Sequence, residues 1–340
     1  RFEIEVPRRV DRALWAEMAG LGWLGLALPE SLGGLGLGLG AGAPLAEIMG
    51  RKAVPEPFVA AALMPSVLLS RCSPDQALVE RLAETIAGGE SLVTVAWQER
   101  AGALEAGVAA TRLEGGRVTG RKCFVPVVED DSVLLVSAQR GGETVVVAVA
   151  ANAPGVSVQR QAGGLMSVAS VSFQEASIMD GAVLLQGAAA EAALQATLEA
   201  GRVAAAAQLT GIASGVLEKT VAYVNERIQF ERPIGSFQSI QHRCVDFRIA
   251  AMLAGAAWRN AQRAFDADPL AASTQAAISA AKSRGGEAAL QASRGSVQMH
   301  GAMGFTEEGG VGVYLRAAMQ LSAWLGNGTA HRRRFLATAA

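Results

Sequence analysis

The chain has 340 residues, of which 51% are hydrophobic and 18% charged, with a formal net charge of −1. This composition allows two or three globular domains and excludes a disordered protein. The absence of a basic stripe with interleaved aromatics argues against nucleic-acid binding. The uncharged runs are too broken to span a bilayer and the first ten residues hold no signal-like core, so we expect no membrane segment. Three scattered cysteines without a C-x-x-C pair favour a reducing compartment, and we expect a cytoplasmic protein.

Helical patterns open the sequence. The blocks V-D-R-A-L-W-A-E-M-A-G-L-G (10–22) and Q-A-L-V-E-R-L-A-E-T-I-A-G-G (76–89) carry apolar residues at helical spacing and close on glycine. We predict an N-terminal helical domain over residues 1–88. Between the two blocks, the glycine cluster 33–44 fits a loose dinucleotide-binding fingerprint, but no β-α-β pattern surrounds it. We expect a flexible loop there.

Short β-branched runs follow. S-L-V-T-V-A-W, D-S-V-L-L-V-S-A and E-T-V-V-V-A-V-A are separated from their neighbours by turn signals such as E-G-G-R and R-G-G-E. This spacing predicts a middle domain over residues 89–186 built as a small antiparallel β-barrel.

The remainder, residues 187–340, is rich in alanine and helical in pattern. Leu209, Ile212, Val216 and Tyr223 share one face of a predicted helix. Long helices with short connections predict a four-helix bundle. The whole is therefore an α+β multidomain chain in the order helices, β-barrel, helical bundle.

Familiar catalytic devices are missing from the sequence. His242, His300 and His331 show no ligand spacing with cysteine or carboxylate, so we expect no metal site. No serine stands in a G-x-S-x-G nucleophile elbow.

Two segments stand out instead. N-E-R-I-Q-F-E-R-P-I-G-S-F-Q-S-I-Q-H (225–242) joins two predicted helices through a turn at Pro233 and Gly235, and its Arg, Gln and aromatic residues could hold an anion beside a stacked ring. S-V-Q-M-H-G-A-M-G-F-T-E-E (296–308) has small residues that permit close backbone approach to a ligand. An ordinary helix hairpin with solvated arginines and a simple helix cap are the alternative interpretations.

Together these segments resemble the acyl-CoA dehydrogenase family. R-I-Q-F-E-R-P-I-G-S-F-Q resembles the family's R-x-x-F-G-x-P-I-x-x-F-Q, and Q-M-H-G-A-M-G-F-T-E-E resembles Q-x-x-G-G-x-G-F-x-x-E. Upstream, L-G-W-L-G-L-A-L-P-E-S-L-G-G-L-G-L is similar to G-x-x-G-L-x-x-P-E-x-x-G-G-x-G. The resemblance covers nearly the whole chain. It implies FAD chemistry, in which a carboxylate removes the α-proton of an acyl-CoA while hydride passes from Cβ to the flavin.

In the family, each FAD lies between two subunits, and the neighbour's bundle contacts the pyrophosphate and adenosine. The residues that this resemblance assigns to the adenosine side are present, with Ala302 and Glu231 replacing glycines. The implied cofactor-binding residues are Arg227, Gln229, Phe230, Phe237, Gln238, Gln298, Gly301 and Ala302. On the isoalloxazine side, residues 97–106 lack the Ser-Asp pair of the family's T-E-P-x-A-G-S-D. Phe124-Val125-Pro126 stands where the family has Trp-x-Thr, and proline offers neither hydroxyl nor N–H.

Both positions at which the family carries its catalytic base lack a carboxylate. One is Asn327, before Gly328-Thr329, and the other is Gly201, before Arg202. A carboxamide cannot accept the α-proton. The pattern resembles the heteromeric, α2β2 acyl-CoA dehydrogenases of actinobacterial steroid side-chain degradation, which have fewer flavins than subunits.

We therefore expect a base-less subunit that completes the FAD site of a catalytic partner carrying Glu or Asp. The implied substrate is an acyl-CoA, a steroid side-chain thioester by resemblance, and the implied electron acceptor is electron-transfer flavoprotein. Two alternatives stay open. The chain could be self-sufficient with Glu199 as base, or it could be a non-catalytic scaffold or regulator that has lost flavin.

Overall fold

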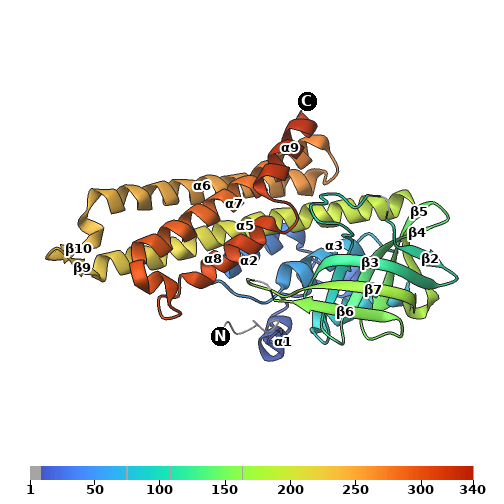
Figure 1. Cartoon of the computed structure of the whole chain (residues 1–340). Helices are drawn as coiled ribbons and strands as arrows, with labels where there is room; N and C mark the ends of the chain where they lie inside the picture. Colours follow the sequence, from blue (N-terminus) through green and yellow to red (C-terminus); the bar gives the residue numbers. More distant parts are fainter. Residues whose placement is uncertain (1–8, 74–75, 108, 163, 340) are drawn as a thin grey trace. The chain divides into compact units, whose positions relative to one another are not determined.

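A computed structural model describes residues 9–73, 76–107, 109–162 and 164–339 (Figure 1). Short helices come first in the chain. Asp11 caps the first of these helices by accepting hydrogen bonds from the N–H groups of Ala13 and Leu14. The last of them, before the sheet begins, is capped at its C-terminal end by Gly89, which has φ of 66°. The elements are α1 (Arg12–Gly20), η1 (Glu30–Leu32), α2 (Gly38–Arg51), η2 (Val59–Leu63), α3 (Met64–Leu69) and α4 (Ala77–Gly88).

Only residues 33–37 of the glycine cluster 33–44 form the loop expected from its composition, because α2 begins at Gly38. Close packing explains Gly42 in this cluster and Gly50 later in the same helix. A Cβ on Gly42 would lie 2.6 Å from the side chain of Leu63, and one on Gly50 would lie 2.0 Å from the carbonyl oxygen of Gln208. Glycine is therefore retained for helix contact, at a cost in helix propensity.

The middle of the chain forms an eight-stranded sheet in the order β6-β7-β3-β2-β4-β5-β8, with β1 paired to β4. Most pairs are antiparallel, but β1 and β2 each pair with β4 in parallel. Alternation of residues along a strand does not encode strand direction, so the sequence could not reveal these two pairs. The strands are β1 (Val93–Ala96), β2 (Arg112–Glu114), β3 (Arg117–Pro126), β4 (Val133–Arg140), β5 (Glu143–Ala150), β6 (Val156–Gln161), β7 (Val168–Ser177) and β8 (Val183–Gln186).

Long helices make up the rest. The interior helix is α7, which packs against α6, α8 and α9 (Figure 1). Its buried residues are mostly Ala, Ser and Gly, which let neighbouring helices approach closely. The elements are α5 (Ala188–Glu226), β9 (Ile228–Gln229), β10 (Arg232–Pro233), η4 (Ile234–Ser236), α6 (Gln238–Ala267), α7 (Ala272–His300), η5 (Gly301–Phe305), α8 (Gly312–Ala323) and α9 (Gly328–Ala339).

The predicted order of helices, sheet and helices is confirmed. The chain divides into two compact units: the described residues up to Gly42 with Glu56–Gly201, and Ala43–Pro55 with Arg202–Ala340. Within the described ranges, no helix is long and apolar enough to cross a membrane.

Candidate functional site

The segment 225–242 forms a small hairpin after α5. In it, β9 and β10 pair so that Gln229 lies opposite Arg232. Phe230 and Glu231 form the two-residue loop, with φ of 52° and 65°. A hairpin loop of this type needs left-handed backbone at both positions, for which Asn and Gly are favoured. The strained loop projects Phe230 into solvent, where 85% of it is exposed.

Cations and aromatic rings surround the hairpin. The Arg232 guanidinium lies 4.2 Å from the centroid of the Phe237 ring, and Phe230 meets Phe237 edge-on with centroids 6.1 Å apart. Arg227 and Gln229 are exposed nearby. Guanidinium groups beside an exposed ring suit a ligand that joins phosphate to a planar heterocycle.

Tyr223 connects this hairpin to the end of α7. Its hydroxyl donates to the carbonyl oxygen of His300 at 3.3 Å, and its ring stacks on the His300 imidazole at 4.1 Å between centroids. Its own carbonyl accepts a hydrogen bond from the Arg227 N–H at 2.9 Å. The two sequence motifs are therefore brought together at one end of the bundle.

The end of α7 leaves its backbone open. Gly301 has φ of 59° and ψ of −134°, a conformation that only glycine adopts easily, and a Cβ there would meet no atom within 4 Å. Gln298 and Ala302 on either side are exposed. The backbone can thus approach a ligand closely, with the Gln298 amide available to it.

The turn between α8 and α9 is held from the interior by Lys282. Its side chain is buried, and Nζ donates to the carbonyl oxygens of Leu321 at 2.9 Å, Ser322 at 3.2 Å and Gly326 at 3.0 Å. The first two carbonyls belong to the last turn of α8, where no backbone donor remains for them. Leu325, inside the turn, has φ of 57°. The lysine therefore stabilises a backbone conformation that a leucine disfavours.

Buried His331 holds the same turn, with Nε2 3.0 Å from the Leu325 carbonyl oxygen. Burial, then the charges of Lys282 and Arg202, lower the pKa of His331 to about 2, so the ring is neutral and Nε2–H donates. Burial and the charge of Arg202 also lower the pKa of Lys282, to about 7.

Asn327 ends the turn and caps α9. Its Oδ1 accepts a hydrogen bond from the Ala330 N–H at 2.9 Å, and its carbonyl accepts one from the His331 N–H at 3.0 Å. Asn is among the best N-cap residues. The side chain at the first expected base position therefore has a structural use and no basic atom.

The second expected base position, Gly201, is buried within α5. Glu199, the alternative base, is 0% exposed, and it accepts a hydrogen bond at 2.6 Å from Nε2 of Gln195 on the preceding turn. The carboxylate thus forms an i, i+4 hydrogen bond within α5.

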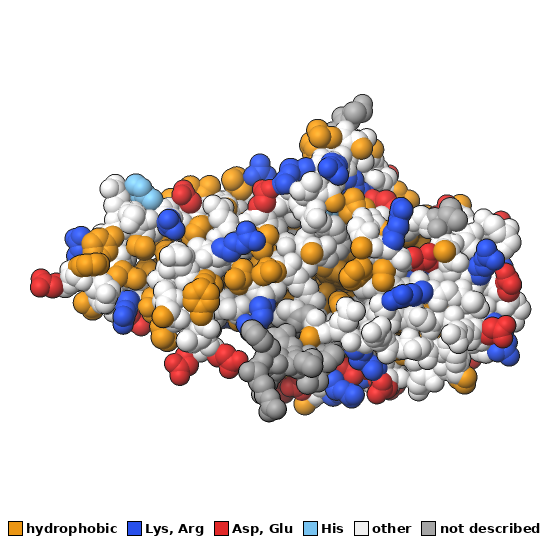
Figure 2. Space-filling model, viewed as in Figure 1, with side chains coloured by type: hydrophobic (Ala, Val, Ile, Leu, Met, Phe, Trp, Pro, Cys, Tyr) orange, Lys and Arg blue, Asp and Glu red, His pale blue; other side chains and the backbone are white. Residues whose placement is uncertain are grey.

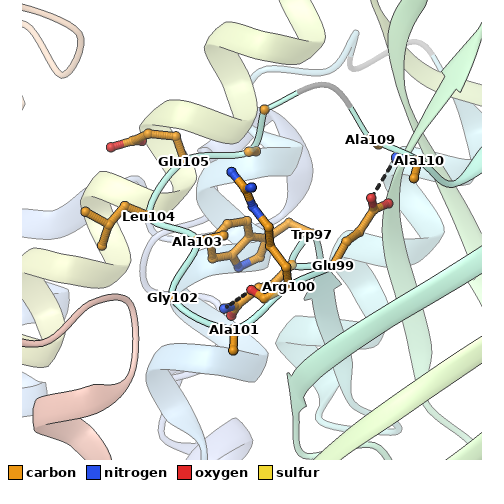
Figure 3. Close-up of a pocket in the computed structure, with 13 residues that line it drawn as sticks. Trp97, Glu99, Arg100, Ala101, Gly102, Ala103, Leu104, Glu105, Ala109 and Ala110 are labelled. Atoms are coloured by element: carbon orange, nitrogen blue, oxygen red, sulfur yellow. Dashed lines mark hydrogen bonds between the residues drawn. The ribbon is translucent and has the colours of Figure 1, made fainter. Parts of the chain in front are cut away.

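The segment implied to face the flavin ring is the loop between β1 and β2, which lines a cavity of about 890 Å³ (Figure 3). Its lining is mainly Ala and Gly, with Trp97, Arg100 and Glu105 among the larger side chains (Figure 3). The sequence of the segment contains neither Ser nor Asp. The cavity is lined by the carboxylates of Glu99 and Glu105 but lacks the Ser-Asp pair that the resemblance leads one to expect.

Glu99 closes this loop at its neck. Its carboxylate accepts hydrogen bonds from the Ala110 N–H, from the Thr111 N–H and hydroxyl, and from Nζ of buried Lys122 at 2.7 Å. Burial acts to raise the pKa of Glu99, but the hydrogen bonds from Lys122, Thr111 and Ala110 outweigh it and lower the pKa to about 2.

The Phe124-Val125-Pro126 segment is a bulge in β3. Its register against β7 shifts between Lys122 and Val125, and Phe124 has φ of 53° with 45% of the residue exposed. The carbonyl oxygen of Pro126 accepts a hydrogen bond from the Thr94 hydroxyl at 3.1 Å. The bulge presents a ring, but Pro126 has no donor for a ligand.

Sequence reasoning missed the groups that hold these loops, Lys282 and the Glu99–Lys122 pair. A signal for Lys282 existed, since it is a lone lysine on the Ala- and Ser-rich face that α7 buries. A buried lysine requires acceptors. Among the described residues, no three His, Cys, Asp or Glu gather as a metal site.

Models of the acyl-CoA dehydrogenase N-terminal domain and of its C-terminal domain match residues 2–89 and 191–339. A chain of the Tcur3481-Tcur3483 steroid ACAD, solved as a variant, is 30% identical, with a TM-score of 0.85 over 97% of this chain and 89% of that one. The chain belongs to the acyl-CoA dehydrogenase family. It is also 29% identical to acyl-CoA dehydrogenase FadE27 of Mycobacterium tuberculosis over 336 residues, 97% of this chain and 88% of that protein.

A chain of the ChsE4-ChsE5 complex from Mycobacterium tuberculosis is 27% identical, with a TM-score of 0.86 over 98% of this chain and 90% of that one. This chain is thus similar to subunits of heteromeric acyl-CoA dehydrogenases, as its motifs indicate.

Acyl-CoA dehydrogenases bind FAD, and the residues of this chain fit one half of it. The bundle end supplies exposed guanidinium and amide donors, an exposed ring, and open backbone at Gly301. These groups suit a pyrophosphate and adenosine. The loop at Glu99 lacks the Ser-Asp pair, and the bulge at Pro126 lacks the threonine hydroxyl, that the resemblance leads one to expect beside the isoalloxazine.

The cap at Asn327 predicts a specific loss of stability. Replacing Asn327 with Ala removes the side-chain acceptor, so the free energy of unfolding should fall by about 1 kcal/mol, within a range of roughly 0.5–2 kcal/mol. Asn327→Asp keeps an acceptor and should remain within a few tenths of a kcal/mol of the unmodified protein. Urea titration followed by circular dichroism measures both. Equal stability of the Ala and Asp variants would show that the cap contributes nothing.

The depressed pKa of Glu99 predicts acid sensitivity. The carboxylate stabilises the fold above its ordinary pKa of 4.5, and this contribution disappears as the pH falls towards about 2. Roughly 2 kcal/mol should be lost between pH 6 and pH 3. Urea titrations at both pH values should show the Glu99→Gln variant much less stable than the unmodified chain at pH 6, with a smaller gap at pH 3. A gap that stays constant would contradict this account.

Proposed function

We propose that this chain is the base-less subunit of a heteromeric, FAD-dependent acyl-CoA dehydrogenase and completes the FAD site of a catalytic partner. One observation carries the proposal: the chain retains exposed cofactor-type donors at the bundle end, yet both base positions hold residues that cannot take a proton. A chain of this kind can bind part of a cofactor and cannot by itself start the reaction.

Different residues of the chain would contact different parts of FAD. Arg227 and the Gln298 amide would hold the pyrophosphate, and Phe230 would pack against the adenine. Gly301 and Ala302 would let the backbone approach the cofactor, while Gln229, Phe237 and Gln238 would complete the contact. When bound, FAD supplies the oxidant for α,β-dehydrogenation. The α-proton would be taken by a Glu or Asp of the partner.

The substrate we propose is a steroid side-chain CoA thioester, and the assembly an α2β2 heterotetramer with electron-transfer flavoprotein as acceptor. Similarity to a chain of a steroid ACAD supports the substrate class, and similarity to a chain of the ChsE4-ChsE5 complex supports an assembly of two unlike chains.

The geometry of Glu199 favours the partner-subunit proposal over a self-sufficient enzyme. Glu199 lies two residues before Gly201, so the two positions point about 200° apart around the helix axis. The carboxylate is also fully buried and bonded to Gln195. It cannot take the direction of the Gly201 position without distortion of α5.

Flavin content tests the proposal. The partner to co-express is an acyl-CoA dehydrogenase-like chain that has an intact base and is encoded beside this gene. Purified alone, the present chain should bind FAD poorly and show no dehydrogenation, because only half of the cofactor is provided for. Co-expressed with the partner, it should form a yellow, active complex with about one FAD per heterodimer, which absorbance measures. A yellow, active homo-oligomer of this chain would contradict the proposal.

The same complex allows a matched arginine comparison. Arg227→Ala should weaken FAD binding about 10- to 100-fold, since a charge-assisted contact contributes roughly 1.5–3 kcal/mol. Arg316→Ala, which removes an exposed arginine on α8, should leave it unchanged. Unchanged FAD affinity in an assembled Arg227→Ala complex would make Arg227 an ordinary surface residue.

A further inference from the structure

Asn327 is followed directly by Gly328. An asparagine before a glycine is the arrangement in which a carboxamide is most readily lost. The next backbone nitrogen can reach the side-chain carbon, and glycine has no Cβ to obstruct the approach. The other asparagines of the sequence are Asn152, Asn225 and Asn260, and none of them precedes a glycine. The position that lacks the expected base is therefore also the one Asn-Gly pair of the chain.

The contacts that fix the α8–α9 turn leave the two reacting groups available. Lys282 and the His331 ring bind carbonyl oxygens between positions 321 and 326, before the Asn-Gly pair. Gly328 is the first residue of α9, so its N–H has no acceptor within the helix. Asn327 is exposed to solvent. Attack by this nitrogen thus breaks none of the contacts that hold the turn.

The cap formed by Asn327 also prepares its side chain for attack. When a nucleophile adds to Cγ, negative charge develops on Oδ1. This oxygen already accepts a hydrogen bond from the Ala330 N–H at 2.9 Å. A backbone donor at the positive end of a helix stabilises an oxyanion that forms there. The same hydrogen bond that caps α9 therefore lowers the barrier to attack on the carboxamide.

Basic side chains lie close to the pair. Arg332, Arg333 and Arg334 follow one another on α9, and Figure 2 shows basic side chains over the part of the bundle where Figure 1 places this helix. A Cβ on Gly328 would lie 3.4 Å from Nη1 of Arg332, which an ion pair with Glu287 holds in place. Positive charge beside the Gly328 N–H favours loss of its proton, and the deprotonated nitrogen is the nucleophile.

We propose that Asn327 of the folded chain is a deamidation site, whose product carries a carboxylate at the position where the resemblance places the catalytic base. The Gly328 nitrogen gives up its proton and forms a bond to Cγ of Asn327. The bond from Cγ to the side-chain nitrogen breaks, and that nitrogen leaves as ammonia. Water then opens the cyclic imide. No oxidant or reductant is needed, and water is the only co-reactant.

The point at which water opens the imide decides the product. Cleavage of the bond between Cγ and the Gly328 nitrogen gives aspartate, which keeps an acceptor for the Ala330 N–H and adds a negative charge at the start of α9. Cleavage at the backbone carbonyl gives isoaspartate, which adds a methylene to the main chain and displaces the cap. In both products position 327 has a group that can accept a proton, which the asparagine lacks.

Mass spectrometry of the aged chain tests the site. The purified chain is incubated in mildly alkaline buffer, with circular dichroism to verify that it stays folded, and is then digested. The peptide that contains Asn327 should gain the mass difference between O and NH. Peptides that contain Asn152, Asn225 and Asn260 should keep their masses. Ion-exchange chromatography should show a more acidic form of the intact chain at the same rate.

Gly328→Ala is the matched variant. Its Cβ would meet the nearest atoms at 3.4 Å, an ordinary contact distance, so the turn can accommodate it. The added carbon obstructs the approach of the nitrogen to Cγ, and conversion should slow about tenfold or more.

Three results would overturn the proposal. The first is an intact Asn327 in the folded chain after a free peptide of residues 323–333 has converted fully. The second is equal conversion of all the asparagines, and the third is an unchanged rate in Gly328→Ala. If Gly328→Ala does not fold, the comparison of Asn327 with the other asparagines decides. These measurements use neither FAD nor a partner chain, so their outcome is independent of the proposed function.

Discussion

A single buried ammonium fixes the turn on which the interpretation depends. Nζ of Lys282 binds three carbonyl oxygens around the α8–α9 turn, and His331 binds a fourth at Leu325. These contacts outweigh the cost of a left-handed leucine, which is of the order of 1–2 kcal/mol. Because the backbone is held in this way, the side chain at position 327 can change without collapse of the turn. At this position Asn327 serves as a helix cap, and its amide cannot take a proton.

Buried polar contacts also hold the loop between β1 and β2, in the unit that contains the sheet. Glu99, Thr111 and Lys122 hold the neck of the loop between β1 and β2, and Ala and Gly supply most of the residues that line its cavity. At the end of the bundle the opposite holds. There the strained hairpin still projects Phe230, and Gly301 still leaves its backbone open. This contrast between the two ends of the chain is what the proposed function explains.

Much of the fold could be predicted from the sequence because local signals agreed with the tertiary structure. Helix α4 ends at the predicted glycine, but the hairpin turns at Phe230 and Glu231 and not at the predicted Pro233-Gly235 turn, because Pro233 pairs with Ile228 in the short ladder. The prediction of a loop over the whole of 33–44 was wrong for the part inside α2, where Gly42 is required by contact with Leu63, a residue that is not near in sequence. The parallel partners of β4 and the carbonyl acceptors of Lys282 also could not be predicted, because each pair of partners is distant in sequence. The motifs themselves identified the bundle-end residues, and only the structure showed Tyr223 joining them.

The claim that this chain supplies no base is tested most directly by steady-state kinetics on the assembled complex carrying Glu199→Gln, with FAD content measured in parallel. The substitution keeps the shape of the side chain and removes its only proton-accepting group. The account predicts that kcat stays within a few-fold of the unmodified complex, and that a carboxylate of the partner chain is the one whose loss abolishes turnover. A fall in kcat of about 10²–10⁴-fold or more at full flavin occupancy, the range typical of a lost general base, would contradict it.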